Sequence, residues 1–477
     1  MITKLEVDGF KNLVDFTIDF GPFTCIAGPN SAGKSNIFDA IQFLAFLTDY
    51  TITEAALKIR GADLDTANIR DLFWTDGTNR RDWFRIATEM IIDGHVIDDF
   101  GRPAEASSTF LRYDITIRYA PPSPDTGLLG RLVLEEEQLK YITQGDAWKR
   151  MRFPHSAEKF RNSAVRNARR TPTGFISVGK SEDGKREIYV HQDGGSRGPA
   201  QTAPADSAPR TIVGTSNTSA TPTILAARRE MQSWRLLALE PTAMRKPDRF
   251  HADAHVTVNG GHLPATIYRL ASESRKKGED PEDVYAEVAT KLSELVSVSS
   301  IKVVTDDVRQ LLTLQVTEAS GVQLPANSLS DGTLRFLALA IIAADSNAKG
   351  VICMEEPENG IHPAKIGAMV ELLREIAVDA SEAPQDDNPL RQVIVATHSP
   401  AFVQLQDPQD LVLALEATVR TNDGLRVEVL RCQPFENTWR APITGGGVGL
   451  FTILTYLTAP PGAQLSLPYA NEVSANK

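Results

Sequence analysis

The segment Gly28-Pro29-Asn30-Ser31-Ala32-Gly33-Lys34-Ser35 matches the pattern G-x-x-x-x-G-K-[ST]. Its glycines let the backbone curl so that successive N–H groups point at phosphate oxygens. In this pattern Lys34 reaches the β- and γ-phosphates of a nucleotide, and the Ser35 hydroxyl binds Mg²⁺. An accidental match is the alternative, expected in roughly one or two per hundred chains of this length from average composition. The segment therefore predicts a nucleotide phosphate-binding loop.

The residues on either side of this loop strengthen the prediction. Residues 23–27 form a short apolar run of the kind found in buried strands, and residues 36–47 have helical spacing of apolar side chains. The loop then ends at a helix N-terminus, where the helix dipole favours an anion. The expected order is strand, glycine loop and helix.

Length and composition bound the class of protein. The chain has 477 residues, of which 42% are hydrophobic and 23% charged, with 50 Lys+Arg against 61 Asp+Glu and a net charge of −11. These values indicate a globular chain of two to four domains, or one domain with large insertions. Three cysteines without a Cys-x-x-Cys pair exclude a disulfide scaffold and a Cys-rich zinc site, and fit a reducing, cytoplasmic compartment. We expect no transmembrane helix and no signal peptide.

Two segments of the middle stand out by composition. Residues 149–170 are strongly basic, which indicates either a nucleic-acid or acidic-partner patch or a solvated loop whose charges are balanced elsewhere. Residues 192–222, rich in Gly, Pro, Ser, Thr and Ala, are expected to form a long loop or linker. Helices are expected at 263–273, 281–298 and 361–377, and strands at 2–7, 13–20, 83–92, 109–119, 300–305, 310–317, 350–354 and 392–396.

Three further motifs follow in order along the chain. The apolar run Val351–Met354 ends in Glu355 and Glu356, which suit Mg²⁺ binding and activation of a water molecule, although solvated acids after a strand are also common. Residues 329–333 (Leu-Ser-Asp-Gly-Thr) precede an apolar helix, as a plain helix cap or as a second anion-binding N-terminus. His398 follows the last apolar strand and is either structural or placed to sense a γ-phosphate.

The ordered set of motifs resembles the ABC-like ATPase heads of the class that includes SMC, RecF and OLD-family proteins. Residues 329–333 are similar to the ABC signature, 350–363 to a Walker B motif with its D-loop, and 397–400 to the switch-histidine motif. The opening Gly9-Phe10-Lys11-Asn12 is similar to the N-terminal strand motif of these heads. The resemblance covers residues 1–120 and 230–420 and leaves the middle unmatched.

The resemblance implies a set of roles. Residues 28–36 bind ATP through Gly28, Pro29, Asn30, Ser31, Ala32, Gly33, Lys34, Ser35 and Asn36. Ser35 and Glu355 hold Mg²⁺, with Glu where most members have Asp. Glu356 is the catalytic base, assisted by His398 and Lys34. Ser330, Asp331 and Gly332 contact ATP bound by another copy, so that two heads close head to tail around two ATP molecules. The glutamine loop is expected near residues 71–73.

The expected architecture is an α/β P-loop NTPase fold of ABC-ATPase type, with a mixed sheet flanked by helices and an inserted, mainly β and loop, segment. We expect an N-terminal lobe over 1–125, the insertion over 126–229 and the remainder of the head over 230–477. Only 77 residues follow Pro400 and they lack a run of acids, so no Toprim nuclease is expected in this chain.

Three functions remain open at this stage. The first is an ATP-hydrolysing, dimerising head, a homodimer or higher even oligomer, that regulates a separate effector such as a nuclease, or a DNA transaction, in antiphage defence or repair. The second is a non-hydrolysing, nucleotide-gated scaffold. The third is the ATPase subunit of a membrane transporter, which the N-terminal strand motif and the long insertion disfavour.

Overall fold

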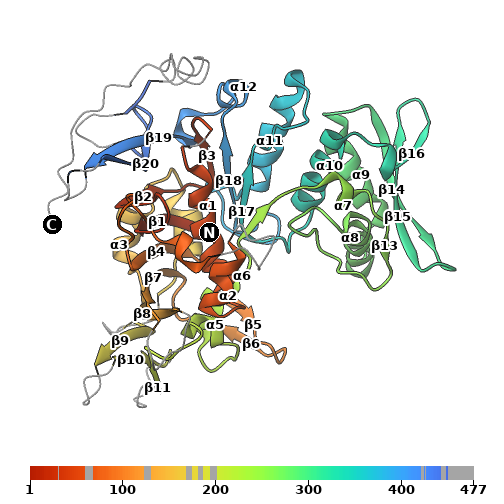
Figure 1. Cartoon of the computed structure of the whole chain (residues 1–477). Helices are drawn as coiled ribbons and strands as arrows, with labels where there is room; N and C mark the ends of the chain where they lie inside the picture. The colour runs from red at the N-terminus through yellow and green to blue at the C-terminus, as the bar shows by residue number, and fades with distance from the viewer. Residues whose placement is uncertain are drawn as a thin grey trace.

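The computed structural model describes most of the chain: residues 1–30, 32–59, 68–122, 130–167, 174–180, 186–193, 201–420, 424, 426–441 and 447–449. These residues form two large sheets with helices between and outside them, and a smaller sheet that projects to one side (Figure 1). The arrangement is α/β, with mixed sheets flanked by helices, as the sequence predicted.

A six-stranded sheet forms the centre of the molecule, in the order β12-β17-β18-β3-β19-β20. Neighbouring strands are parallel from β12 to β19, and β20 is antiparallel to β19. The bounds are β3 (Phe23–Ala27), β12 (Arg235–Leu237), β17 (Gly350–Glu355), β18 (Arg391–Thr397), β19 (Leu411–Arg420) and β20 (Arg426–Pro434). Strand β3 comes from the N-terminal end of the chain, whereas its neighbours lie more than 350 residues further on.

Both faces of this sheet are buried, which explains why its strands are apolar throughout. On β17, Val351 and Cys353 face one hydrophobic cluster, and Ile352 and Met354 face another. The first cluster contains α1 (Lys34–Phe46); the second contains α10 (Asp331–Ala344) and α11 (Ile366–Ile376). The alternation of side chains along one strand therefore joins two cores.

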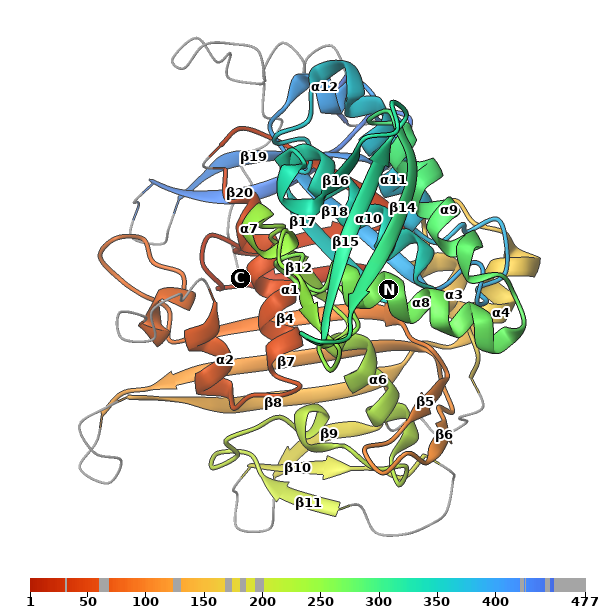
Figure 2. The same ribbon diagram turned by 90° about the vertical axis from the view of Figure 1, so that its right-hand side faces the viewer.

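An eight-stranded antiparallel sheet packs on the other side of α1, in the order β11-β10-β9-β8-β7-β4-β1-β2. Figure 2 shows it below the central sheet. The bounds are β1 (Ile2–Asp8), β2 (Phe16–Asp19), β4 (Trp83–Ile91), β7 (Phe110–Ala120), β8 (Arg131–Tyr141), β9 (Ile176–Lys180), β10 (Arg186–Val190) and β11 (Gln201–Pro204). Strand β8 pairs with β7 along its whole length, so the sheet continues across the domain boundary expected at residue 125. The three domain ranges stay predictions.

The smaller sheet consists of β13 (Asp248–Arg249), β14 (Val298–Asp306), β15 (Leu311–Glu318) and β16 (Gln323–Pro325). It packs with α8 (Leu263–Lys277) and α9 (Pro281–Ser293) at the edge of the second core (Figures 1 and 2). The other described elements are α2 (Ile52–Lys58), α3 (Gln144–Arg150), α4 (Asn162–Ala164), α5 (Ile212–Thr215), α6 (Pro222–Gln232), α7 (Pro241–Met244), α12 (Pro400–Val403), β5 (His95–Ile97), β6 (Pro103–Glu105), η1 (Ile69–Leu72), η2 (Ala157–Arg161), η3 (Ala326–Ser328), η4 (Pro363–Lys365) and η5 (Pro408–Asp410).

Two expectations for secondary structure were wrong in part. The helix expected over 281–298 ends at Ser293, because Val298 already begins β14 and pairs with Glu318. The linker expected over 192–222 contains β11 and α5 in its described part. The α5 turn is ordered because the backbone N–H groups of Ile212 and Val213 donate to the buried Glu137 carboxylate, at 2.8 and 3.0 Å. The amino-acid composition of residues 192–222 gives no information about this acceptor, because Glu137 lies far away in the sequence.

The pH dependence of stability provides a test of this anchor. Burial raises the pKa of Glu137 to about 7, from 4.5. Between these values the folded chain keeps a proton that the unfolded chain has released, so stability falls as pH rises through this window. From pH 4 to pH 8 the wild type should lose about 3 kcal/mol more unfolding free energy than Glu137→Gln, as measured by urea denaturation. Glu136→Gln, at the exposed neighbouring position, is the control. Equal pH slopes in wild type and Glu137→Gln would contradict the expectation.

Candidate nucleotide-binding site

A cavity of about 350 Å³ lies where the parallel strands of the central sheet end. Strands β3, β17 and β18 run in the same direction, so the loops that follow them meet at their carboxyl edge. The cavity is lined by residues of all three strand ends: Asn30, Gly33, Lys34, Ser35, Asn36, Glu355, Glu356 and Ala396. Motifs more than 300 residues apart in the sequence therefore share one site.

The loop after β3 has the backbone shape needed to surround an anion. Gly33 has φ of +89°, and a Cβ there would lie 2.2 Å from the Asn12 side chain. The Gly28 N–H donates to Thr397 O at 3.1 Å, which fixes the start of the loop to the end of β18. Lys34 Nζ donates hydrogen bonds to the carbonyl oxygens of Gly28 and Pro29, both at 2.8 Å. The lysine at the end of the loop is therefore bonded to the first two residues of the loop. Burial lowers the pKa of Lys34, while Glu356 and Glu355 act in the opposite direction.

Asn12 holds this loop in place. Its Oδ1 accepts a hydrogen bond from Asn36 Nδ2 at 2.7 Å, and its Nδ2 donates to Ala32 O at 3.4 Å. The preceding Lys11 pairs with the nearly buried Asp39 of α1 at 2.7 Å. The sequence contained a signal for these contacts in the Gly9–Asn12 motif, but no role had been assigned to Asn12.

The acids after β17 lie on the opposite wall of the cavity. Glu356 adopts a left-handed backbone conformation, with φ of +48°, and its N–H donates to Ala396 O at 2.8 Å. Its Oε2 accepts a hydrogen bond from Asn359 Nδ2 at 2.7 Å. His398 Nδ1 lies 2.7 Å from Glu356 Oε1, an ion-pair contact whose angle does not make a hydrogen bond. Glu356 is thus fixed between Asn359 and His398.

Glu358 is a third acid of this motif for which the sequence analysis assigned no role. It is 8% exposed, accepts a hydrogen bond from Thr397 Oγ1 and leaves Oε2 without a partner. Burial raises its pKa, and the charge of Glu356 acts in the same direction. The sequence shows the Glu-Glu-Pro-Glu motif, but only the fold shows that the side chain of its last acid, Glu358, contacts Thr397 at the end of β18.

The signature-like segment lies outside this cavity in the same chain. Ser330 caps α10 by accepting from Thr333 N at 3.2 Å, and Asp331 pairs with Arg245 at 2.7 Å. A Cβ on Gly332 would lie 2.3 Å from Gly360 O, so the start of α10 rests on the loop after Glu356. None of the three residues expected to contact ATP here is among the residues that line the described cavity.

The donor set fits Mg²⁺. The Ser35 hydroxyl and the Glu355 carboxylate line the same cavity, and both are hard oxygen ligands. Mg²⁺ commonly takes one or two protein ligands and completes its shell with water and phosphate oxygens. This explains why no group of three or more His, Cys, Asp or Glu side chains suited to a metal is found among the described residues. Ser31 lies outside the described residues.

Two other expectations concern the surroundings of the site. The segment proposed as the glutamine loop forms η1 and packs on the N-terminal motif, since Lys11 N donates to Leu72 O at 2.8 Å. Its role stays a prediction.

The charges of the basic stretch, residues 149–170, are mostly neutralised. Of its six described cations, four pair with acids: Arg150 with Glu89, Arg152 with Asp19, Lys159 with Glu382 and Arg166 with Glu105. This favours balanced charge over a free nucleic-acid patch. Arg169 and Arg170 lie outside the described residues.

Comparison with family models finds AAA-type domains at both ends of the chain. A model described as "AAA domain, putative AbiEii toxin, Type IV TA system" matches residues 258–404, and one described as "AAA domain" matches residues 4–89. Among the described residues, no helix is both long and apolar enough to cross a membrane.

Curated relatives are similar over one segment only. The chromosome partition protein Smc of Bordetella petrii (strain ATCC BAA-461 / DSM 12804 / CCUG 43448) is 31% identical over 111 residues, or 23% of this chain and 8% of that protein. Structural maintenance of chromosomes protein 1 of Schizosaccharomyces pombe (strain 972 / ATCC 24843) is 34% identical over 83 residues, or 17% and 6%. The match thus spans less than a tenth of the length of these relatives.

Solved SMC heads show a weak overall likeness. An SMC head bound to the C-terminal winged-helix domain of ScpA has a TM-score of 0.45 and 16% identity, and covers 90% of this chain and 97% of that chain. The SMC head domain from Thermotoga maritima has a TM-score of 0.35 and 12% identity, and covers 91% and 99%.

The site and the family matches together point to one class of protein, P-loop proteins with AAA-type domains. Within that class, the chain resembles the ATPase heads of SMC and RecF type, and the Smc relatives support the resemblance seen in the sequence over one segment. Proteins of these families are generally ATPases that use a nucleotide and usually Mg²⁺.

The contact between Asn12 and the loop leads to a test. Asn12→Ala removes both hydrogen bonds, at about 1 kcal/mol each, and leaves the Ala32–Gly33 backbone without its support. We expect ATP affinity, measured with a fluorescent ATP analogue, to fall by roughly tenfold while the melting temperature changes little. Asn68→Ala, an exposed asparagine at the start of η1, is the control. Unchanged affinity in Asn12→Ala would contradict a supporting role.

Proposed function

We propose that the chain binds Mg·ATP in this cavity and hydrolyses it. The observation that carries the proposal is the meeting of Lys34, Ser35, Glu355 and Glu356 around one cavity, with His398 against Glu356. Lys34 and the loop N–H groups bind the phosphates, and Ser35 and Glu355 hold the metal ion. Glu356, as general base, orients a water molecule and accepts its proton as the water oxygen attacks the γ-phosphorus. The bond from the γ-phosphorus to the β,γ-bridging oxygen breaks, and ADP leaves with that oxygen.

We further propose that two copies close head to tail around two ATP molecules. The location of Ser330, Asp331 and Gly332 outside the cavity of their own chain supports this, because they remain available to a nucleotide held by a partner. The N-terminus of α10, capped by Ser330, would then face the γ-phosphate of that nucleotide. The signature residues would contact the γ-phosphate only in the closed dimer, so bound ATP would favour the dimer. Hydrolysis would remove these contacts, and the two copies would separate.

The partner is proposed at the level of class only. A head of this kind would transmit closure to a separate effector, such as a nuclease, or to DNA, in antiphage defence or repair. The description of one matching family model, a putative toxin of a type IV toxin–antitoxin system, supports a role in bacterial conflict. The paired cations of the basic stretch give DNA binding through that segment little support.

Glu356→Gln tests hydrolysis and ATP-driven closure together. The amide cannot accept the proton, so phosphate release should fall by at least about a hundredfold while ATP still binds. In Mg·ATP the variant should double its mass by light scattering, whereas the wild type returns to its starting mass as ATP is consumed. Glu371→Gln, an exposed acid on α11, is the control. A wild type without turnover but with ATP-dependent mass would favour the alternative function, a non-hydrolysing nucleotide-gated scaffold.

Mixing two inactive variants tests whether the signature acts in trans. Lys34→Ala disables the loop, and Ser330→Arg blocks the signature; each alone should be inactive. In a mixed dimer, the intact loop of one copy meets the intact signature of the other. Half of random dimers are mixed and each has one working site of two, so activity should recover to roughly a quarter of wild type. No recovery, with mixed dimers demonstrated by differently tagged copies, would contradict closure in trans.

A further inference from the structure

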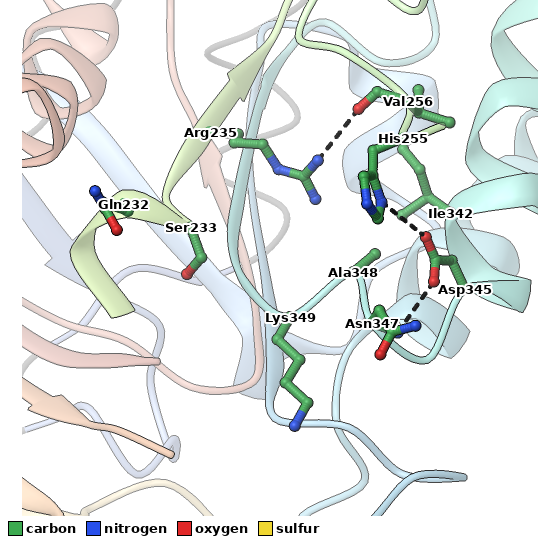
Figure 3. Close-up of a pocket in the computed structure, with 10 residues that line it drawn as sticks. All are labelled: Gln232, Ser233, Arg235, His255, Val256, Ile342, Asp345, Asn347, Ala348 and Lys349. Atoms are coloured by element: carbon green, nitrogen blue, oxygen red, sulfur yellow. Dashed lines mark hydrogen bonds and ion pairs between the residues drawn. The ribbon is translucent and has the colours of Figure 1, made fainter. Parts of the chain in front are cut away.

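A second cavity, of about 280 Å³, lies at the opposite edge of the central sheet (Figure 3). It is found where β12 and β17 begin, whereas the nucleotide cavity lies where β17 and β18 end. Its lining residues come from the end of α6, the start of β12, the segment before α8, the end of α10 and the turn before β17: Gln232, Ser233, Arg235, His255, Val256, Ile342, Asp345, Asn347, Ala348 and Lys349. None of the sequence motifs reaches this cavity.

Arg235 is the central cation of this cavity. It is partly buried, and Figure 3 shows its guanidinium beside the imidazole of His255 at one side of the cavity. Its Nη1 donates to Val256 O at 3.2 Å, yet within the described part of the chain it makes no ion pair with a carboxylate. Burial lowers its pKa, with Asp345 opposing that change. A guanidinium has five N–H donors, so one carbonyl partner leaves most of its binding capacity unused.

The acid in the cavity already has its own partners. Asp345 is 3% exposed, its Oδ2 accepts from Arg269 Nη2 at 2.6 Å, and its Oδ1 accepts from Asn347 N at 3.0 Å. His255 Nδ1 is further away, at 3.8 Å from Oδ2. The Asp345 carboxylate is therefore engaged by Arg269, and it acts on Arg235 through its charge alone, without an ion pair between them.

A second buried arginine stands behind the cavity. Arg391, 4% exposed at the start of β18, donates to the carbonyls of Ile342, Ala343 and Asp345 and caps the end of α10. Its Nε has no hydrogen-bond partner. Burial lowers its pKa to about 10.

The charges around this cavity do not balance. Among the residues that line it, the cations are Arg235 and Lys349 and the acid is Asp345, so cations exceed acids by 2 − 1 = +1 before His255 is counted. Lys349 pairs with Asp93 at 2.7 Å and Asp345 pairs with Arg269 at 2.6 Å, which leaves Arg235 as the lining cation without an ion pair among the described residues. A partly buried guanidinium without an ion pair is well suited to bind an oxyanion.

We propose that this cavity binds a phosphate group, free or as a small phosphomonoester, between Arg235 and His255. The two side chains supply donors of different geometry, one from the start of β12 and one from the segment before α8, which suits a tetrahedral oxyanion. The cavity is slightly smaller than the usual small-molecule pocket of about 300–1,000 Å³, which suits a small anion. The site is independent of the ATP site and of the proposed ATPase activity.

The test measures phosphate binding where the P-loop cannot contribute. Inorganic phosphate is titrated by calorimetry into full-length Lys34→Ala, and into the same chain carrying Arg235→Gln in addition. We expect about one phosphate per chain, with affinity at least about tenfold lower when Arg235 is replaced, because charge-assisted hydrogen bonds are lost. Arg309→Gln, on the exposed turn between β14 and β15, is the matched control and should bind as tightly as the parent. The same titration with phosphoserine shows whether the cavity binds an esterified phosphate or a free phosphate more tightly.

Two measurements guard against a folding artefact. The melting temperature of Arg235→Gln without phosphate should equal or exceed that of the parent, since an unpaired buried cation is removed. In the wild type, phosphate should slow the reaction of Arg235 with phenylglyoxal, followed by peptide mass spectrometry, without slowing that of Arg309. His255→Gln should weaken binding by roughly threefold. The proposal is overturned if neither probe binds at about 10 mM, if Arg235→Gln binds phosphate as its parent does, or if phosphate leaves Arg235 modification unchanged.

Discussion

The pairing of β3 with β18 and β19 is the constraint on which the site depends. Its register sets Ala27 opposite Thr397 and Leu413. This places the phosphate-binding loop, which starts one residue later, beside the end of β18. Because both faces of the sheet are buried, no strand can shift its register without moving apolar side chains into the wrong core. The geometry of the loop is therefore fixed by contacts that involve no ligand.

The same parallel sheet explains why polar chemistry collects at its two edges. At the carboxyl edge, Lys34, Glu355 and Glu356 line one cavity, so a cation lies close to two acids. At the amino edge, cations exceed acids around Arg235. Between the edges the side chains of the sheet are mostly apolar and buried, and ionised groups would be costly to bury there. The two sites are thus separated by the core that supports them.

Sequence patterns predicted the sheet strands and the P-loop well, because their signals are local. Val351–Met354 is apolar because both of its faces are buried, and Gly33 is required where φ is positive. Local rules failed where a distant partner decided the outcome. The order in α5 depends on Glu137, on a strand 75 residues earlier, and the roles of Asn12 and Glu358 depend on contacts with the loop and with β18.

By itself, the sequence determined that this chain has a P-loop nucleotide-binding head and which residue types serve it, because the glycine, lysine, serine and glutamate spacings are set by phosphate and metal chemistry. Only the tertiary structure decided which of these residues share a cavity, that Ser330 and Gly332 lie apart from it, and that Arg235 lacks an acidic partner. Those facts depend on strand order and on long-range pairing. A linear pattern contains neither, because residues brought together by folding are not neighbours along the chain.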